Sequence, residues 1–173
     1  IIGPDDMVLL PQLSSYQLFS DLMAAIRNHQ LQVFFQPICE AGGTQRGVEA
    51  LARWRHPQRG WVEPQVFLEM AEQHRQMNQL GRELIRLSLD GFQQLQQKQP
   101  ELFLYLNVAP SQLLDPALAS TLLEQLRLRN LAPTQLILEL TEHSILEPNA
   151  CVKQNLETLR QVGVRLALDD FGT

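Results

Sequence analysis

Short apolar runs alternate with helical patterns along most of the chain, and this alternation narrows the set of folds open to it. From residue 100 onward, apolar runs at 102–106, 136–140 and 164–168 are separated by two stretches with apolar residues at helical spacing. Strands that alternate with helices through short connections form parallel sheets with right-handed crossovers. The sequence therefore predicts an α/β fold built on a parallel sheet.

The first hundred residues add two strand candidates. A β-type run at 33–35 is expected to stop at Gln36 and Pro37, because proline removes a hydrogen-bond donor from the ladder. Extended structure is expected to resume over 47–51. The other expected features are a linker over 1–14, helices from Ser15 and over about 65–75 and 78–98, and a loop over 57–63. The five strand candidates start near residues 33, 47, 102, 136 and 164.

Composition limits the class of protein. With 173 residues, 45% hydrophobic and 19% charged, the chain has the balance of one globular domain. A formal net charge of −5 argues against a broad basic surface for DNA. No apolar run approaches the ~20 residues of a membrane span, so we expect a cytoplasmic domain without membrane contact from this segment. Cys39 and Cys151 are too few and too far apart for a disulfide framework and are expected to be reduced.

Oxygen-bearing side chains lie in or just after the C-terminal halves of four strand candidates. They are Glu49, Asn107, Glu139 and the pair Asp169 and Asp170. A single acid at a strand end is more often a helix cap or turn residue, but in a parallel α/β sheet the C-terminal edge collects ligand-binding residues. Carboxylates that met there would repel one another unless a cation lay among them, and Mg²⁺ and Mn²⁺ prefer oxygen ligands. The adjacent aspartates can serve two ions, which indicates a two-metal hydrolytic centre.

Six short motifs follow one another in a characteristic order. They are FQPI at 35–38, EALARWRHP at 49–57, FLEMAE at 67–72, LNV at 106–108, ELTE at 139–142 and DDFGT at 169–173. In order and spacing they resemble the EAL domain, the phosphodiesterase family that acts on cyclic di-GMP. The resemblance covers roughly residues 15–173, with 1–14 as an N-terminal extension.

The resemblance implies a TIM-type (β/α) barrel that opens cyclic di-GMP to linear pGpG by hydrolysis assisted by two Mg²⁺ or Mn²⁺ ions. The ions would polarise the scissile phosphodiester and activate a water for in-line attack. By position, one ion would be held by Glu49, Asn107, Glu139 and Asp169, with Asp169 bridging to the second ion and Asp170 bound to that ion. The implied catalytic residues are Glu49, Asp169, Asp170 and Glu142.

Further positions match substrate contacts of the family. These are Gln36, Leu51 and Arg53, and Asn107 is counted with them. Arg53 is the expected phosphate clamp, because the planar guanidinium suits phosphate oxygens. Glu142 matches a glutamate that steadies the loop after the fifth barrel strand and so supports the metal geometry.

The motifs end before a complete barrel. A TIM barrel takes about 250 residues and eight strands, so five strand candidates predict an incomplete barrel, the N-terminal two-thirds of the domain. The family's later lysine, glutamate and glutamine are missing, and Ala109-Pro110 departs from the family pattern. Three explanations are open: an omitted C-terminal part, a truncated product that assembles with another chain, or a degenerate domain kept for binding. A chain that ends at Thr173 is expected not to turn over substrate alone.

Two main functions are open. The first is hydrolysis of cyclic di-GMP by the completed domain, which the intact set of residues for the first metal favours. The alternative is an inactive EAL domain that senses cyclic di-GMP or docks a partner protein; a different metal-dependent phosphoesterase is disfavoured by the E-A-L-x-R segment. The linker-like N-terminus suggests an upstream sensory or GGDEF-type domain, and a homodimer through EAL domains is a further option. Trp54 and Trp61 are expected to be packing or rim aromatics rather than platforms for base stacking.

Overall fold

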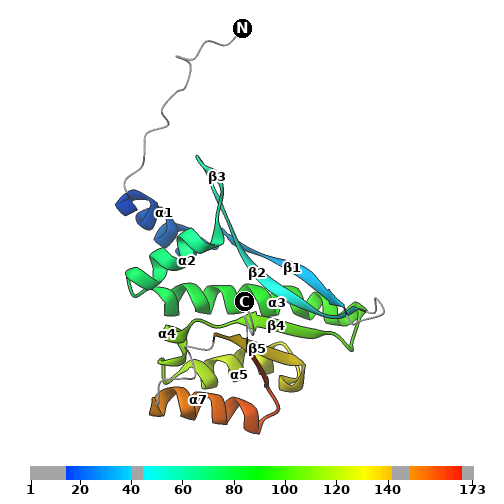
Figure 1. The fold of residues 1–173 in the computed structure, drawn as a ribbon. Helices are drawn as coiled ribbons and strands as arrows, with labels where there is room; N and C mark the ends of the chain where they lie inside the picture. The colour runs from blue at the N-terminus through cyan, green and yellow to red at the C-terminus, as the bar shows by residue number, and fades with distance from the viewer. Residues whose placement is uncertain (1–14, 40–44, 142–148, 169–173) are drawn as a thin grey trace, which may run out of the picture.

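The computed structural model describes residues 15–39, 45–141 and 149–168 (Figure 1). Within them, strands and helices alternate as the sequence predicts. The elements in chain order are α1 (Ser15–Arg27), β1 (Leu31–Cys39), β2 (Gln45–His56), β3 (Gly60–Val62), α2 (Pro64–Gln73), α3 (Met77–Lys98), β4 (Phe103–Asn107), α4 (Pro110–Leu113), α5 (Leu118–Leu128), the 3₁₀ turn η1 (Pro133–Gln135), β5 (Leu136–Leu140), α7 (Ala150–Gln161) and β6 (Arg165–Leu168). No helix in these ranges is both long enough and apolar enough to cross a bilayer.

One sheet joins all of the described strands. Its order is β1-β2-β4-β5-β6, and β3 pairs with β2 alone. Strands β2, β4, β5 and β6 are parallel, which confirms the α/β prediction. Strands β1 and β3 pair with β2 in antiparallel register, so the prediction of an entirely parallel sheet is wrong at this end. Only residues 40–44 separate β1 from β2, a length that suits a hairpin and is too short for a crossover.

Two sequence predictions about the N-terminal strands are also wrong. Strand β1 does not stop at Gln36 and Pro37, because Pro37 pairs with Val48 and the strand continues to Cys39. Proline is tolerated there because β1 lies at the edge of the described sheet, where half of the backbone amides face away from the partner strand. The expected loop over 57–63 contains β3, which forms a tight hairpin with the end of β2.

The main core lies between one face of the sheet and helices α3, α5 and α7. Alternate strand residues point to it, as the two-residue period of a strand requires. Strand side chains in this cluster include Val48, Ala50, Leu104, Leu106, Leu136, Leu138 and Leu140, and helix side chains include Leu89, Phe92, Leu122 and Leu159. The residues between them on the strands face the opposite side of the sheet, where the predicted site residues lie.

A second core cluster supports the end of β2 that extends beyond β4. The cluster joins α1 and α2 to the hairpin of β2 and β3. Trp54 of β2, only 1% exposed, belongs to this cluster. The Trp54 ring meets the Phe67 ring of α2 edge-on, with centroids 6.0 Å apart. Trp54 is therefore a packing residue, as the sequence predicts. This packing supports β3 and the adjoining end of β2, which lie at the end of the molecule away from α7 (Figure 1).

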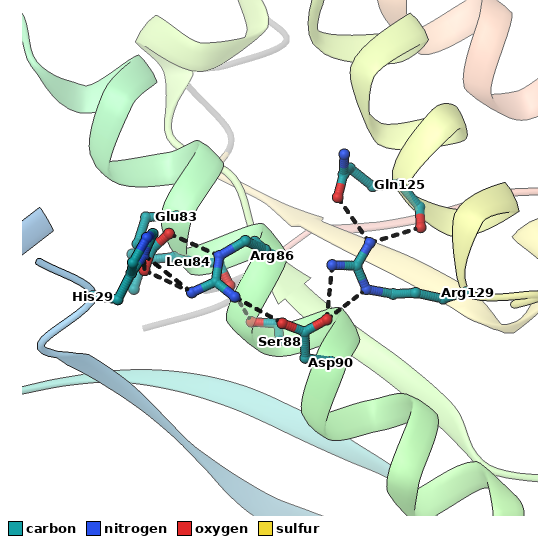
Figure 2. Close-up of polar contacts among 8 residues, drawn as sticks. All are labelled: His29, Glu83, Leu84, Arg86, Ser88, Asp90, Gln125 and Arg129. Atoms are coloured by element: carbon teal, nitrogen blue, oxygen red, sulfur yellow. Dashed lines mark hydrogen bonds and ion pairs between the residues drawn. The ribbon is translucent and has the colours of Figure 1, made fainter. Parts of the chain in front are cut away.

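A chain of polar contacts connects the α1–β1 turn to α3 and to the end of α5 (Figure 2). His29 Nδ1 lies 2.9 Å from Glu83 Oε1, and Arg86 donates to both Glu83 oxygens at 2.8 and 2.9 Å. Arg86 also donates to Asp90, which accepts a second hydrogen bond from Arg129. The hydrogen bonds from Arg86 hold the pKa of Glu83 below its ordinary value of 4.5, although burial acts in the opposite direction.

Replacing Glu83 with glutamine is expected to lower the free energy of unfolding at pH 7 by about 1–3 kcal/mol, as for a lost charged hydrogen bond. Because the pKa of Glu83 is lower in the folded state, its stabilisation is present above pH 4.5 and is lost as the pH falls through the folded pKa. The difference between Glu83→Gln and the unmodified protein should therefore shrink below pH 4.5. Urea unfolding at pH 7, 5, 4 and 3 measures it.

Glu157→Gln provides the matched control. Glu157 is 53% exposed and its carboxylate lies 3.9 Å from Lys153 Nζ, so its loss should change stability by less than about 0.5 kcal/mol. A Glu83→Gln difference that stayed constant down to pH 3 would contradict the assignment.

Candidate functional site

Three of the predicted metal-site residues lie on three adjacent parallel strands. Glu49 is on β2, Asn107 is the last residue of β4, and Glu139 is on β5. Asn107 Nδ2 donates a hydrogen bond of 2.9 Å to Glu49 Oε1. Asn107 is paired with Glu139 in the parallel register of β4 and β5. The sheet thus brings together residues from three separate parts of the sequence.

Strand geometry explains why these side chains share one face. Glu49 is paired with Tyr105, and Asn107 is two positions beyond Tyr105 on the same strand. Residues two apart on a strand point the same way, and paired residues on adjacent strands do so too. Glu49 and Glu139 are half-buried and Asn107 is exposed, and all three lie on the face of the sheet opposite to the main core.

The three predicted substrate residues on β1 and β2 lie beside this group. Gln36 is paired with Glu49 across the two strands, and Leu51 follows on the same face of β2. Arg53 is one further position along that face, and its Nη1 donates a hydrogen bond of 2.8 Å to the Ala52 carbonyl. This bond holds the guanidinium close to its own strand.

A cavity of about 630 Å³ opens at the end of β4, where β2 extends beyond its parallel partner. Such a volume is typical of a small-molecule site. Its polar lining includes Arg53, Asn107, Glu139 and Thr141, and helices α2 and α3 enclose it from behind with apolar side chains and with Glu69 and Glu72. Two of the predicted metal residues, Asn107 and Glu139, therefore border the same cavity as the predicted phosphate clamp Arg53, and Glu49 reaches it through its hydrogen bond with Asn107.

The segment after Asn107 is held by a residue that our sequence interpretation missed. Gln112 is 4% exposed, and its Oε1 accepts a hydrogen bond of 3.0 Å from the Ala109 amide. The Val108 amide donates to the Glu139 carbonyl at 3.0 Å, which extends the pairing of β4 and β5 past Asn107. The signal was present in the sequence, because Pro110 at the first helical position and glutamine three residues after Ala109 match a helix cap.

The donor set suits a hard divalent cation. Glu49, Asn107 and Glu139 offer carboxylate and amide oxygens, which Mg²⁺ and Mn²⁺ prefer. Among residues 15–39, 45–141 and 149–168, no three His, Cys, Asp or Glu side chains lie close enough to form a complete site. Glu142, Asp169 and Asp170 lie outside the described residues. Asp169 directly follows Leu168, which pairs with Leu140 next to Glu139.

Comparison with known proteins gives one consistent result. The family model described as "EAL domain" matches residues 20–173. The cyclic di-GMP phosphodiesterase RocR of Pseudomonas aeruginosa is 34% identical over 154 residues, which are 88% of this chain and 39% of RocR. The bifunctional diguanylate cyclase and cyclic di-GMP phosphodiesterase MucR of the same organism is 33% identical over 165 residues, 91% of this chain and 23% of MucR. The chain thus spans less than half the length of these relatives.

Two solved structures have the same fold. The MucR phosphodiesterase in complex with c-di-GMP aligns with a TM-score of 0.83 at 32% identity, over 91% of this chain and 64% of that one. The EAL enzyme Bd1971 in its cAMP- and cyclic-di-GMP-bound form aligns with a TM-score of 0.85 at 25% identity, over 93% of this chain and 45% of that one.

Proposed function

Because the chain belongs to the EAL domain family, we propose that it hydrolyses cyclic di-GMP to linear pGpG in a reaction assisted by two Mg²⁺ or Mn²⁺ ions. The observation that carries the proposal is the contact between Glu49 and Asn107, with Glu139 paired to Asn107 on the next strand. The name of RocR, at 34% identity, is cyclic di-GMP phosphodiesterase, and two relatives from Escherichia coli at 32% identity are named probable cyclic di-GMP phosphodiesterases, which supports the choice of substrate. The proposal places the domain in the cytoplasm.

In this proposal the site residues divide into two groups. Glu49, Asn107 and Glu139 would hold the first ion together with Asp169, and Asp170 would bind the second. The ions supply positive charge that polarises the phosphodiester and lowers the pKa of a bound water. The hydrogen bond between Asn107 and Glu49 fixes the carboxylate in position before any ligand binds, so that less order has to be created on binding.

The second group positions the dinucleotide. Arg53 would bind phosphate oxygens, because its guanidinium offers a planar pair of donors and its hydrogen bond to Ala52 already restricts its rotamers. Gln36 of β1 and Leu51 of β2 would contact the substrate from two adjacent strands. Glu142 would steady the segment after β5 and so keep the metal ligands in place.

The test is direct conversion of cyclic di-GMP. The protein, expressed from its own gene at its natural length, is incubated with cyclic di-GMP and Mg²⁺ or Mn²⁺, and the products are separated by chromatography and weighed by mass spectrometry. We expect linear pGpG. Binding of cyclic di-GMP without product would instead support the sensor alternative.

Metal removal is expected to abolish the reaction. Protein dialysed against EDTA should form no detectable pGpG, and excess Mn²⁺ should restore the rate, because the charge on the scissile phosphate is then neutralised again. The control is Ca²⁺ added at the same ionic strength, which separates a specific requirement from a general salt effect. Full turnover by chelated protein would contradict the two-metal proposal.

A further inference from the structure

Phe34 of β1 and Trp61 of β3 form an exposed aromatic pair beside the proposed substrate site. Phe34 is 47% exposed and Trp61 is 54% exposed, whereas Trp54 is 1% exposed. The Phe34 and Trp61 rings contact each other edge to face, with centroids 5.6 Å apart and planes inclined by 72°. Exposed aromatic clusters of this kind mark binding surfaces more often than isolated exposed apolar residues do. The structure therefore separates the two tryptophans, which the sequence treats alike.

Two arginines border this aromatic pair. The guanidinium carbon of Arg53 lies 5.6 Å from the centre of the Phe34 ring, and that of Arg55 lies 6.0 Å from the centre of the Trp61 ring. In a chain with a net charge of −5, two guanidiniums next to exposed rings give a local attraction for an anion that carries planar groups. A nucleotide has both features.

Strand register places the pair in line with the proposed metal residues. Phe34 is paired with Leu51, two positions beyond Glu49, and Trp61 is paired with Arg55. At about 3.3 Å per residue, Leu51 lies roughly 7 Å along β2 from Glu49. Trp61 pairs with Arg55, six positions and about 20 Å along β2 from Glu49, but its ring contacts the Phe34 ring. A dinucleotide with one phosphate at Glu49 and the other beside Arg53 could therefore extend one base toward Phe34 and Trp61.

We propose that Trp61, supported by Phe34, stacks on one guanine base of cyclic di-GMP and so helps to position the substrate. This inference rests on the proposed function for its ligand. The inclined rings form a corner in which a planar base can stack on one ring and meet the edge of the other. Arg53 and Arg55 add charge beside the base, where the adjoining phosphate lies. Trp61 is thus a positioning residue at the rim of the site.

Affinity measurements test this role. Trp61→Ala is expected to weaken the binding of pGpG, the product of the reaction, by about tenfold. The same substitution should raise KM for cyclic di-GMP more than it lowers kcat. Trp61→Phe keeps a ring and should stay within about threefold of the unmodified protein, whereas Trp61→Leu, which has bulk but no ring, should resemble Trp61→Ala. Tyr16→Ala is the matched control, because Tyr16 is 76% exposed on α1 and should leave affinity unchanged.

Tryptophan fluorescence gives an independent readout. The chain has two tryptophans, and Trp54 is buried, so a ligand that stacks on Trp61 should quench the exposed part of the emission. In Trp61→Phe this quenching should disappear, although binding persists. The Trp54 emission that remains also reports whether each Trp61 variant is folded.

The outcomes separate this inference from the proposed function. If the unmodified protein binds cyclic di-GMP with quenching but forms no pGpG, the proposed function fails and the stacking role stands. If Trp61→Ala is folded and binds as tightly as the unmodified protein, the stacking role is wrong, whatever the activity. If cyclic di-GMP and pGpG do not bind at all, both are wrong.

Discussion

Replacing Glu49 with glutamine is expected to lower kcat for cyclic di-GMP hydrolysis by at least about a hundredfold, the effect of removing one electrostatic group from a reaction centre. Glutamine keeps the shape of the side chain and an oxygen that can accept the hydrogen bond from Asn107 Nδ2. It removes the negative charge that a divalent cation requires. The loss should therefore appear in kcat and in the Mn²⁺ concentration needed for half-maximal rate, without a loss of folding stability.

Glu101→Gln is the control for this experiment. Glu101 is exposed and lies just before the start of β4, whereas Asn107 is the last residue of that strand. Its substitution should therefore leave kcat unchanged. The rate of pGpG formation is measured by chromatography over a series of Mn²⁺ concentrations. If Glu49→Gln kept more than half of the unmodified rate, Glu49 would not hold a catalytic ion.

Replacing Leu138 with alanine is expected to lower the free energy of unfolding by about 2–5 kcal/mol, the usual cost of a cavity in a packed core. Leu138 is fully buried in β5, and the register pairs it with Leu106 on one side and Leu166 on the other. Urea unfolding followed by circular dichroism measures the change.

Leu128→Ala is the same chemical change at an exposed position. Leu128 is 59% exposed at the end of α5, and we expect a change of less than about 0.5 kcal/mol. Because Glu139 is adjacent to Leu138, the Leu138→Ala variant should also lose affinity for Mn²⁺ near its unfolding midpoint. Equal stability of the two variants would show that β5 is not at the centre of the core.

The parallel part of the sheet and much of the site could be predicted from the sequence. The runs at 102–106, 136–140 and 164–168 are too apolar to be exposed, and the helices between them fix their direction by the crossover rule. Once the strands are parallel, polar residues near their C-terminal ends have to meet at one edge. Asn107 and Glu139 follow from this reasoning alone, and the structure brings them into register.

The antiparallel hairpins and the aromatic pair could not be predicted in the same way. The run Val33-Phe34-Phe35 predicts a strand but does not indicate whether its neighbour is parallel or antiparallel. Only the pairing with β2 decides which face of the sheet Phe34 occupies. Likewise, the sequence around Trp54 and Trp61 does not indicate which of the two side chains is buried. Which of them is buried depends on where α2 packs, and this is a contact between distant parts of the chain.

The sequence by itself determined the α/β class, the parallel strands and the residue types that collect at their ends, because these depend on local periodicity and on short connections. Only the tertiary structure decided the direction of β1, the contact of Asn107 with Glu49, and the exposure of Trp61 beside Arg53 and Arg55. The physical reason is that side-chain burial and strand pairing are set by packing between segments that the chain brings together from far apart.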